Sequence, residues 1–440
     1  MASLNKTQRA RTHEGAKARR FTPEQELKRT LMNALLWENQ FYEDGVSIAE
    51  RMAKLAPLVK PERVADLAIE AREQMKLRHA PLLIVREMAR SEKHRALVAD
   101  TLERIIQRPD ELTEFLAIYW DDALGPLQQR KKQPVSAQAK KGLARALGKF
   151  DAYQLAKYDR DGPVRIRDVL FLVHAKPKDT AQEKVWAALV DGTLASPDTW
   201  EVSLSAGKEK RETFERLLAE KKLGGLALLR NLRLMTNAGV PRATIAQAIE
   251  AMRTDRILPY RFIAAARYAP DFEPELEAVM LKSVKDHARL KGSTRLLIDV
   301  SASMAAPLSQ QSEMTRMEAA AGLAILVREI AKEVEIFTFS NEVKKVPPRR
   351  GFALRDAIVQ SQPHGGTYLG KALEAIDKPG IRLIVFTDEQ AHDRVGAPKG
   401  LGYMINVASY QRGVGHGDWR RVDGFSEAVI SWIAAAEDAD

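Results

Sequence analysis

The first two thirds of the chain carry apolar residues at helical spacing. In the segment PERVADLAIEAREQM, residues Val64, Leu67, Ala68, Ala71 and Met75 recur at intervals that place them on one face of a helix. Similar amphipathic segments follow one another, and many are joined by short turns containing Pro, Gly or Asp. A long row of such helices predicts an irregular α-solenoid, in which neighbouring helices bury each other's apolar faces.

The pattern changes near residue 292. Four short β-rich runs follow, with the sequences STRLLIDVS, VEIFTFS, IRLIVFTDE and GYMINVAS. Helical stretches lie between and after them, at 317–333, 352–360, 368–377 and in SEAVISWIAAAE. Continuous apolar strands that alternate with helices predict a parallel sheet covered on both faces. We therefore expect a multidomain α and α/β protein, whose last domain is a doubly wound, Rossmann-like α/β domain.

Charge supports a similar division. Residues 1–290 contain 51 basic and 40 acidic residues, whereas residues 291–440 contain 18 and 19. The predicted domains are a flexible basic arm at 1–21, a helical repeat domain at 22–290 and the α/β domain at 291–440. A basic helical module favours an anionic partner such as nucleic acid. The alternative is a solvated helical surface that is merely rich in Lys and Arg.

Composition excludes several classes of protein. The chain has no cysteine, so disulfides, thiol nucleophiles and zinc–cysteine sites are excluded. It has no apolar run long enough to cross a membrane, and its polar N-terminus lacks the apolar core of a secretory signal. These features predict a cytoplasmic protein without a membrane partner.

Polar residues follow two of the predicted strands. Asp299 ends the first strand, Ser301 and Ser303 lie in the loop after it, and Asp388 ends another strand. Thr367 follows two glycines just before a helix. Ligands of doubly wound sheets bind at the carboxyl ends of the strands. Two carboxylates with three hydroxyls suit a small hard cation, so we predict one divalent ion here, Mg²⁺ or alternatively Mn²⁺.

These five residues resemble the metal-ion-dependent adhesion site of von Willebrand factor A domains, D-x-S-x-S followed by Thr and Asp. The alternative is that Ser301 and Ser303 cap the next helix and that Asp388 only terminates a strand. We expect no enzyme activity, because the sequence has no G-x-S-x-G, P-loop or H-E-x-x-H motif and no evident base for Ser301. A third hypothesis is a Mg²⁺-dependent phosphohydrolase, but aspartyl-phosphate enzymes use D-x-D, whereas the third position here is Ser301.

The helical region carries a second resemblance. The segments KFDAYQLAKY, RDVLFLVHAKP, TWEVSLS, GLALLRNLRLM and ILPYRFIAA occur in this order between residues 149 and 265. With DGFSEAVISWI near the end, they are similar to the Ro60/Rsr family, whose TROVE domain precedes a von Willebrand factor A domain. The resemblance implies a monomeric ring of HEAT-like repeats. It also implies binding of small non-coding Y RNA and of single-stranded ends of misfolded RNA, for RNA quality control, maturation or decay.

The same resemblance implies a 3′ exoribonuclease as a partner, polynucleotide phosphorylase among them. The rival hypothesis is a protein-interaction module, in which the A domain captures an acidic residue of another protein and RNA is not the ligand. Salt-sensitive RNA binding that survives chelation would favour the first hypothesis. Metal-dependent capture of a protein without RNA binding would favour the second.

Candidate RNA-binding residues come from the resemblance and from local charge. Lys157 and His174 match family positions that contact Y RNA, whereas Asp161 stands where the family has a basic residue. The full candidate set is Arg130, Lys131, Lys132, Lys157, Arg160, His174, Lys176, Arg230 and Arg233. Phosphate contacts dominate RNA affinity, so these cations are expected to bind the backbone more than the bases.

Overall fold

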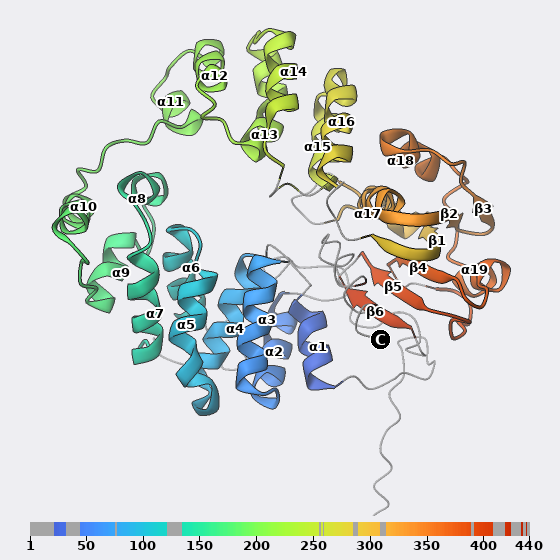
Figure 1. Cartoon of the computed structure of the whole chain (residues 1–440), viewed down its shortest axis with the longest axis horizontal. Helices are drawn as coiled ribbons and strands as arrows, with labels where there is room; N and C mark the ends of the chain where they lie inside the picture. Colours follow the sequence, from blue (N-terminus) through green and yellow to red (C-terminus); the bar gives the residue numbers. More distant parts are fainter. Residues whose placement is uncertain are drawn as a thin grey trace, which may run out of the picture. The chain divides into compact units, whose positions relative to one another are not determined.

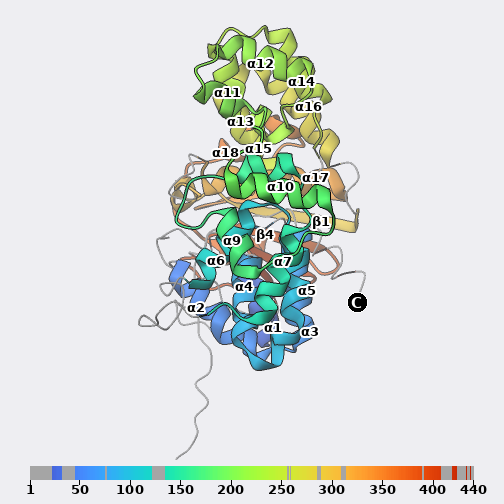
Figure 2. The same ribbon diagram turned by 90° about the vertical axis from the view of Figure 1, so that its left-hand side faces the viewer.

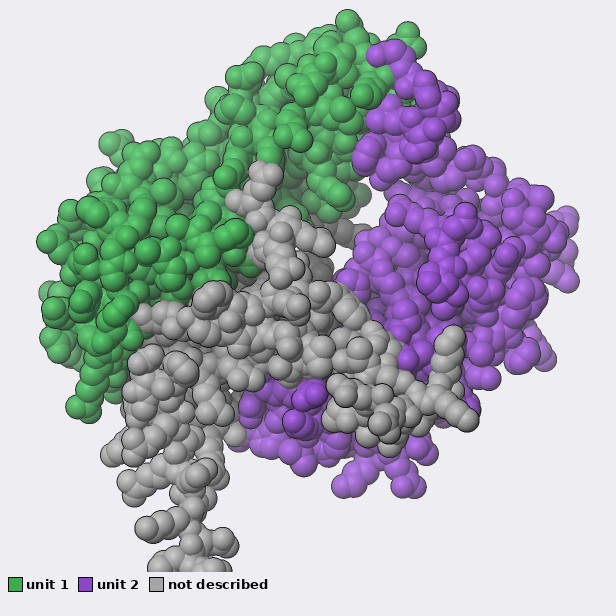
Figure 3. Space-filling view, turned by 180° about the vertical axis from the view of Figure 1, so that it is seen from behind, with its two compact units in different colours: residues 1–20, 38–43, 210–440 green, residues 21–37, 44–209 purple. Residues whose placement is uncertain are grey.

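The computed structural model describes residues 22–31, 45–74, 77–120, 134–254, 257, 259–284, 289–308, 314–388, 391–407, 419–423, 433 and 437. The predicted arm at 1–21, the cluster Arg130, Lys131 and Lys132, and nearly all of SEAVISWIAAAE lie outside the described residues. The described chain forms two compact units, coloured separately in Figure 3. One consists essentially of residues 44–209 with 21–37, and the other is built mainly from residues 210–440.

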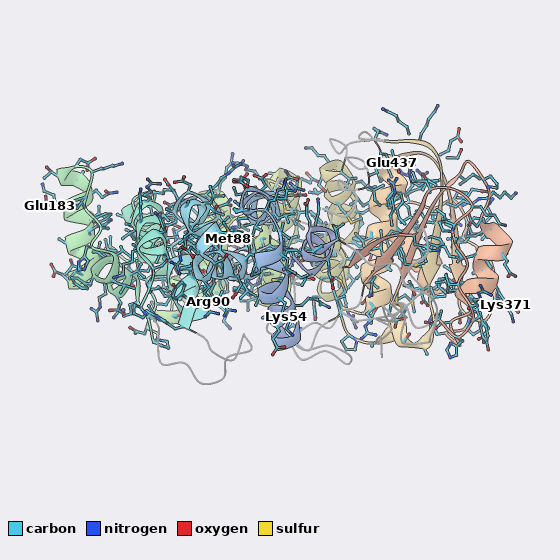
Figure 4. The ribbon with its side chains drawn as sticks, turned by 90° about the horizontal axis from the view of Figure 1, so that it is seen from below. Lys54, Met88, Arg90, Glu183, Lys371 and Glu437 are labelled. Carbon is cyan, nitrogen blue, oxygen red and sulfur yellow. The ribbon has the colours of Figure 1, made fainter. Side chains whose placement is uncertain are left out.

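The unit of residues 44–209 is helical. Its helices are α1 (Pro23–Leu31), α2 (Gly45–Leu55), α3 (Pro61–Glu73), α4 (His79–Arg90), α5 (Arg95–Ile105), α6 (Asp110–Trp120), α7 (Ala137–Leu147), α8 (Ala152–Tyr158), α9 (Ile166–Val173), α10 (Thr180–Asp191) and α11 (Trp200–Ser205). Helix α4 packs against α3 and α5, α5 packs against α7, and α7 packs against α9 (Figure 1). Met88 of α4, labelled in Figure 4, is fully buried. This is the row of paired helices that the apolar spacing predicts.

Buried charge ties several of these helices together. Glu111, at the start of α6, is almost fully buried and pairs with Arg72 of α3. The same carboxylate accepts hydrogen bonds from the backbone amides of Gln107 (2.7 Å) and Arg108 (3.1 Å). Arg72 also donates to the carbonyl oxygen of Ile105 (2.9 Å). One carboxylate therefore caps a helix and neutralises a guanidinium at the same time.

The second unit combines the last helices of the predicted helical domain with the sheet. Its helices are α12 (Lys210–Ala219), α13 (Gly225–Asn237), α14 (Arg242–Ala251), α15 (Pro259–Tyr268), α16 (Glu273–Ser283), α17 (Arg316–Ile330), α18 (Gly351–Val359) and α19 (Leu369–Ile376). Its strands are β1 (Leu290–Asp299), β2 (Ala331–Phe339), β3 (Val343–Lys345), β4 (Arg382–Thr387), β5 (Gly402–Asn406) and β6 (Arg420–Asp423). The compact units thus divide the chain near residue 210, and the predicted boundary at 290 remains a prediction.

The sheet has the order β3-β2-β1-β4-β5-β6, with only β3 antiparallel. Leu297 of β1 packs with α19 residues such as Leu369 and Leu373 on one face. Side chains alternate along a strand, so Leu296 and Ile298 point to the other face, which α17 covers (Figure 1). The fold class is confirmed: helical repeats precede a doubly wound α/β domain.

A carboxylate from α16 holds the start of α18. Glu277 accepts a hydrogen bond from the backbone amide of Phe352 (2.8 Å), which supplies the acceptor that an isolated helix N-terminus lacks. Gly351 has a φ of 52°, and a Cβ at this position would overlap the Glu277 carboxylate. Glycine therefore serves both the left-handed conformation and the close approach. This contact and the Arg355–Glu273 pair (3.5 Å) join the last helices to the sheet domain.

The sequence pattern misplaces the start of β2 and does not predict β3 or β6. The run VEIFTFS predicts a strand from 334, but β2 begins at Ala331 immediately after α17, so the helix predicted to reach 333 ends at Ile330. The edge strands β3 and β6 were not predicted, since both are short and polar.

In the parts of the chain that the structure describes, none of the helices has the length and apolar character needed to cross a membrane.

Candidate functional site

The predicted cation site lies where the strand order reverses. Strand β1 is followed along the chain by β2 on one side of it and pairs with β4 on the other. Asp299 is the last residue of β1, and Asp388 follows Thr387 at the end of β4. This switch point is where doubly wound sheets leave a crevice for ligands. Topology therefore explains why residues far apart in the sequence meet here.

The two carboxylates are both completely buried. The backbone amide of Ser301 donates to Asp299 Oδ1 (2.9 Å), and the hydroxyl of Thr387 donates to Asp299 Oδ2 (2.7 Å). Burial, together with the nearby charge of Asp388, raises the pKa of Asp299 to about 7. Two ionised carboxylates in this environment are unfavourable unless a cation compensates them.

The hydroxyl groups of Ser301 and Ser303 lie next to each other. Ser301 Oγ lies 3.2 Å from Ser303 Oγ, and the Ser301 side chain makes no capping bond to the short 3₁₀ helix η5 (Ala302–Ala305) that follows. The next α-helix, α17, is capped by Thr315 instead. Helix capping therefore does not account for the two serines.

Thr367 is held by a loop that the sequence does not connect with it. Its backbone amide donates to Nδ1 of His392 (3.1 Å), and the His392 amide donates to the carbonyl oxygen of Thr367 (2.8 Å). Asp393, the next residue, accepts hydrogen bonds from the amides of Gly370 and Lys371 (both 2.8 Å) at the start of α19. Lys371 itself lies exposed on that helix (Figure 4). The 391–394 loop thus fixes both Thr367 and the helix behind it.

The loop between β2 and β3 supports the glycines before Thr367. Ser340 Oγ accepts a hydrogen bond from the amide of Gly365, and Asn341 Oδ1 accepts one from the amide of Gly366 (both 2.8 Å). His364 lines a cavity of about 460 Å³ beside the site, with its Nδ1 2.8 Å from the carbonyl oxygen of Val300. These contacts position the backbone of the Thr367 loop at the strand ends.

Arg316 brings a positive charge to the site. Its side chain is mostly buried, and Nη1 lies 3.4 Å from Asp388 Oδ2 and 3.3 Å from the carbonyl oxygen of Ser303. Three residues at this centre were missed by sequence reasoning: Arg316, Thr387 and His392. Only Thr387 carried a signal, because it precedes Asp388 at the strand end. Arg316 and His392 are brought in by tertiary structure.

The donor set fits a small divalent cation. It offers two buried carboxylates with hydroxyl oxygens of Ser301, Ser303 and Thr367, which is the hard oxygen chemistry that Mg²⁺ and Mn²⁺ prefer. In the described residues no group of three or more His, Cys, Asp or Glu side chains could hold a metal ion. A cation here would therefore depend on two carboxylates and on neutral hydroxyls.

The candidate RNA-binding residues that the structure describes fall into two sets, one in each unit. Lys157 lies in the last turn of α8, and Arg160 is exposed after the helix. His174 (φ 50°) and Lys176 follow α9. Lys157 Nζ lies 6.0 Å from the ring centre of Tyr153 and 5.8 Å from that of Tyr158. The local acidic residue Asp161 pairs with Arg165 (3.2 Å). This set is an exposed, cationic segment.

The second set is on α13. Arg230 and Arg233 are both exposed, and the Arg233 guanidinium lies 5.3 Å from the ring centre of Tyr268. Asn231, between them, is buried and donates to the carbonyl oxygen of Ala227 (2.8 Å). Asn231 therefore stabilises its own helix, while the two arginines face solvent.

Comparison with known proteins decides the family. The sequence matches the family model for the TROVE domain over residues 5–191 and 191–330, which is most of the chain. The chain belongs to the Ro60/Rsr family. Family membership makes it an RNA-binding protein. Residues 294–390 match the model for the von Willebrand factor type A domain, the segment that contains all five candidate metal ligands.

Solved structures give the same fold. The chain is similar to the crystal structure of the Deinococcus radiodurans Ro (Rsr) protein, with a TM-score of 0.62 and 20% sequence identity, over 94% of this chain and 99% of that one. Among curated proteins the sequence has no significant match. At this identity the likeness establishes the fold of a Ro60/Rsr protein and leaves individual site residues to be argued from their own geometry.

Changes at the candidate carboxylates and at the neighbouring Arg316 are expected to have opposite effects on metal affinity. Asp388→Ala or Asp299→Ala is expected to weaken Mg²⁺ or Mn²⁺ binding sharply, because each removes a charged ligand. Arg316→Gln is expected to tighten binding by roughly tenfold, because it removes a cation that opposes the ion at Asp388. Calorimetric titration of the metal-stripped protein measures both changes.

Arg328→Gln is the control for Arg316→Gln, since it removes the same charge from the other end of α17. RNA affinity is expected to stay within about twofold in the Asp388→Ala protein, because the ion is expected to act apart from phosphate binding. Equal metal affinity for the Arg316→Gln and Arg328→Gln proteins would show that Arg316 does not influence the ion.

Proposed function

We propose that this protein is a monomeric ring that binds small non-coding RNA of the Y type and single-stranded ends of misfolded RNA. In this role it acts in RNA quality control, maturation or decay in the cytoplasm. It binds RNA without cleaving it and presents it to a 3′ exoribonuclease, of which polynucleotide phosphorylase is one candidate. The TROVE match across most of the chain carries the proposal.

The charge pattern around α8 and α9 supports RNA as the ligand. Three acidic groups converge on one residue, Arg165: its guanidinium pairs with Asp159 and Asp161 (both 3.2 Å), and its amide donates to Asp168 (2.8 Å). Within the described part of the chain, no ion pair engages the nearby cations Lys157, Arg160, Arg167 and Lys176. Unpaired cations next to neutralised carboxylates form a phosphate-binding surface. The Asp161 departure from the family pattern is thus locally compensated by Arg165.

The first experiment is recovery of the tagged protein from its own cells under mild salt, followed by sequencing of the RNA that accompanies it. One or a few small folded RNAs, enriched over total RNA, are expected. A preparation that carries no RNA and binds none in vitro would contradict the proposal. Capture of a protein that depends on Mg²⁺ and on Asp299 would then favour the rival function, an A domain that binds an acidic partner residue.

The double change Lys157→Ala with His174→Ala is expected to weaken binding of structured RNA about tenfold, while single-stranded ends still bind. Each lost phosphate contact also lowers the dependence of affinity on salt concentration, by about one in the logarithmic slope. Fluorescence anisotropy at several salt concentrations measures both quantities.

Lys93→Ala is the matched control, because it removes an exposed lysine of the same unit. If the double change leaves the affinity for every RNA unaltered, these two positions do not bind RNA. Phosphohydrolase activity would contradict the non-catalytic role if it were lost in the Asp299→Ala protein.

A further inference from the structure

Exposed aromatic rings lie in the same short segment as the unpaired cations. Phe171 of α9 is 58% exposed and Tyr153 of α8 is 50% exposed. The other large apolar residues exposed in the described chain are Leu58, Leu226 and Tyr268. Two of five such residues therefore fall within the segment 153–176, which also contains four of the candidate RNA-binding residues.

Helix periodicity places Phe171 beside a cation. Arg167 and Phe171 are four residues apart, so they lie on one side of α9, and His174 follows the end of the helix. The buried residues Ile166, Val169 and Val173 form the other side, and α9 packs against α6 and α7 (Figures 1 and 2). The ring of Phe171 is thus left in solvent because the packed face of its helix is already complete.

Tyr153 shows the same combination on α8. It lies four residues before Lys157, whose ammonium group is near its ring. The Arg108 guanidinium lies 4.8 Å from the ring centre of Tyr158, on the next turn. An aromatic face beside a cation can stack on a base while the cation contacts the adjacent phosphate.

We propose that Phe171 and Tyr153 stack on unpaired bases of the bound RNA, between the phosphate contacts of Lys157, Arg167 and Lys176. The inference rests on the proposed function and adds base contacts to it. RNA is favoured over an apolar protein partner because the segment that carries the rings is rich in cations, and its carboxylates are already engaged by Arg165. A paired duplex keeps its bases stacked inside, so only looped or single-stranded RNA can use these rings.

The test compares two RNA probes of equal length and charge, a hairpin with an unpaired loop and a fully paired duplex. Phe171→Leu keeps an apolar side chain but removes the stacking face. It is expected to weaken hairpin binding roughly five- to hundredfold and to leave duplex binding within about twofold. Phe171→Trp is expected to retain or increase hairpin affinity. Tyr153→Leu is expected to show the same selectivity.

Leu58→Ala is the control, since Leu58 is an exposed apolar residue of the same unit that lacks an aromatic face. Equal loss of affinity for both probes in the Phe171→Leu protein, or no loss for either, would overturn stacking while the proposed function stands. Failure of the unaltered protein to bind either probe would overturn both, since no base would then be present to stack. The thermal unfolding midpoint, measured for every variant, separates a folding defect from a lost contact.

Discussion

Glu111→Ala is expected to lower the free energy of unfolding of the helical unit by about 3–5 kcal/mol. The change leaves the largely buried Arg72 guanidinium without its charged partner. It also removes the acceptor for the amides of Gln107 and Arg108, where α6 begins. Urea unfolding followed by circular dichroism measures the loss as a lower transition midpoint.

Two control variants separate charge from capping. Glu111→Gln keeps an oxygen acceptor for the two amides but loses the charge, so its effect should lie between those of the unaltered protein and Glu111→Ala. Glu73→Ala breaks the exposed pair with Arg104 (2.6 Å) and should cost only about 0–1 kcal/mol. If Glu111→Ala costs no more than Glu73→Ala, burial does not strengthen the Glu111 contacts.

The central strands β4 and β5 were predictable because their middle residues form short apolar runs. Every residue of β4 and β5 is buried, as expected for the inner strands of a parallel sheet that is covered on both faces. Strand β6, with the sequence RRVD, looks like a loop, because an edge strand gains its pairing from a neighbour and not from its own apolar residues. The junction of α17 and β2 was missed for a related reason: no turn residue separates them.

The position of the two candidate carboxylates at the ends of the neighbouring strands β1 and β4 was also predictable, and metal binding by the five residues stays a prediction. The residues that contact these candidate ligands were not predictable. Arg316 reaches Asp388 from the start of α17, and His392 reaches Thr367 across 25 residues of chain. Such contacts depend on how loops fold back on the sheet, and residue spacing carries no information about that.

In the helical unit, the sequence predicts the net charge but not which charged residues form ion pairs. The excess of basic residues in 1–290 suggests an anionic partner without saying where it binds. The structure adds which charges are already neutralised: Arg72 is matched by Glu111, and Arg165 engages three aspartates. One set without ion pairs, around Lys157 and Lys176, also has exposed aromatic rings beside it. Position and neutralisation, more than net charge, define the candidate RNA surface.

Gly370→Ala is expected to destabilise the α/β domain by about 2–4 kcal/mol and to weaken divalent-cation binding. A Cβ on Gly370 would overlap the carbonyl oxygen of Arg394, a backbone atom that cannot turn away as a side chain could. The 391–394 loop would have to move, and with it His392, which holds the backbone of Thr367 through two hydrogen bonds. The methyl group added at position 370 should therefore displace Thr367, a candidate ligand of the metal.

Gly396→Ala is the matched control for Gly370→Ala. It adds the same methyl group shortly after the same loop, where a Cβ would meet no atom within 4 Å. This control should unfold and bind Mn²⁺ like the unaltered protein, whereas Gly370→Ala should change both the thermal midpoint and the calorimetric affinity. If Gly370→Ala lowers stability but binds Mn²⁺ normally, then Thr367 does not depend on the His392 loop. In that case the two carboxylates and the serines would suffice to hold the ion.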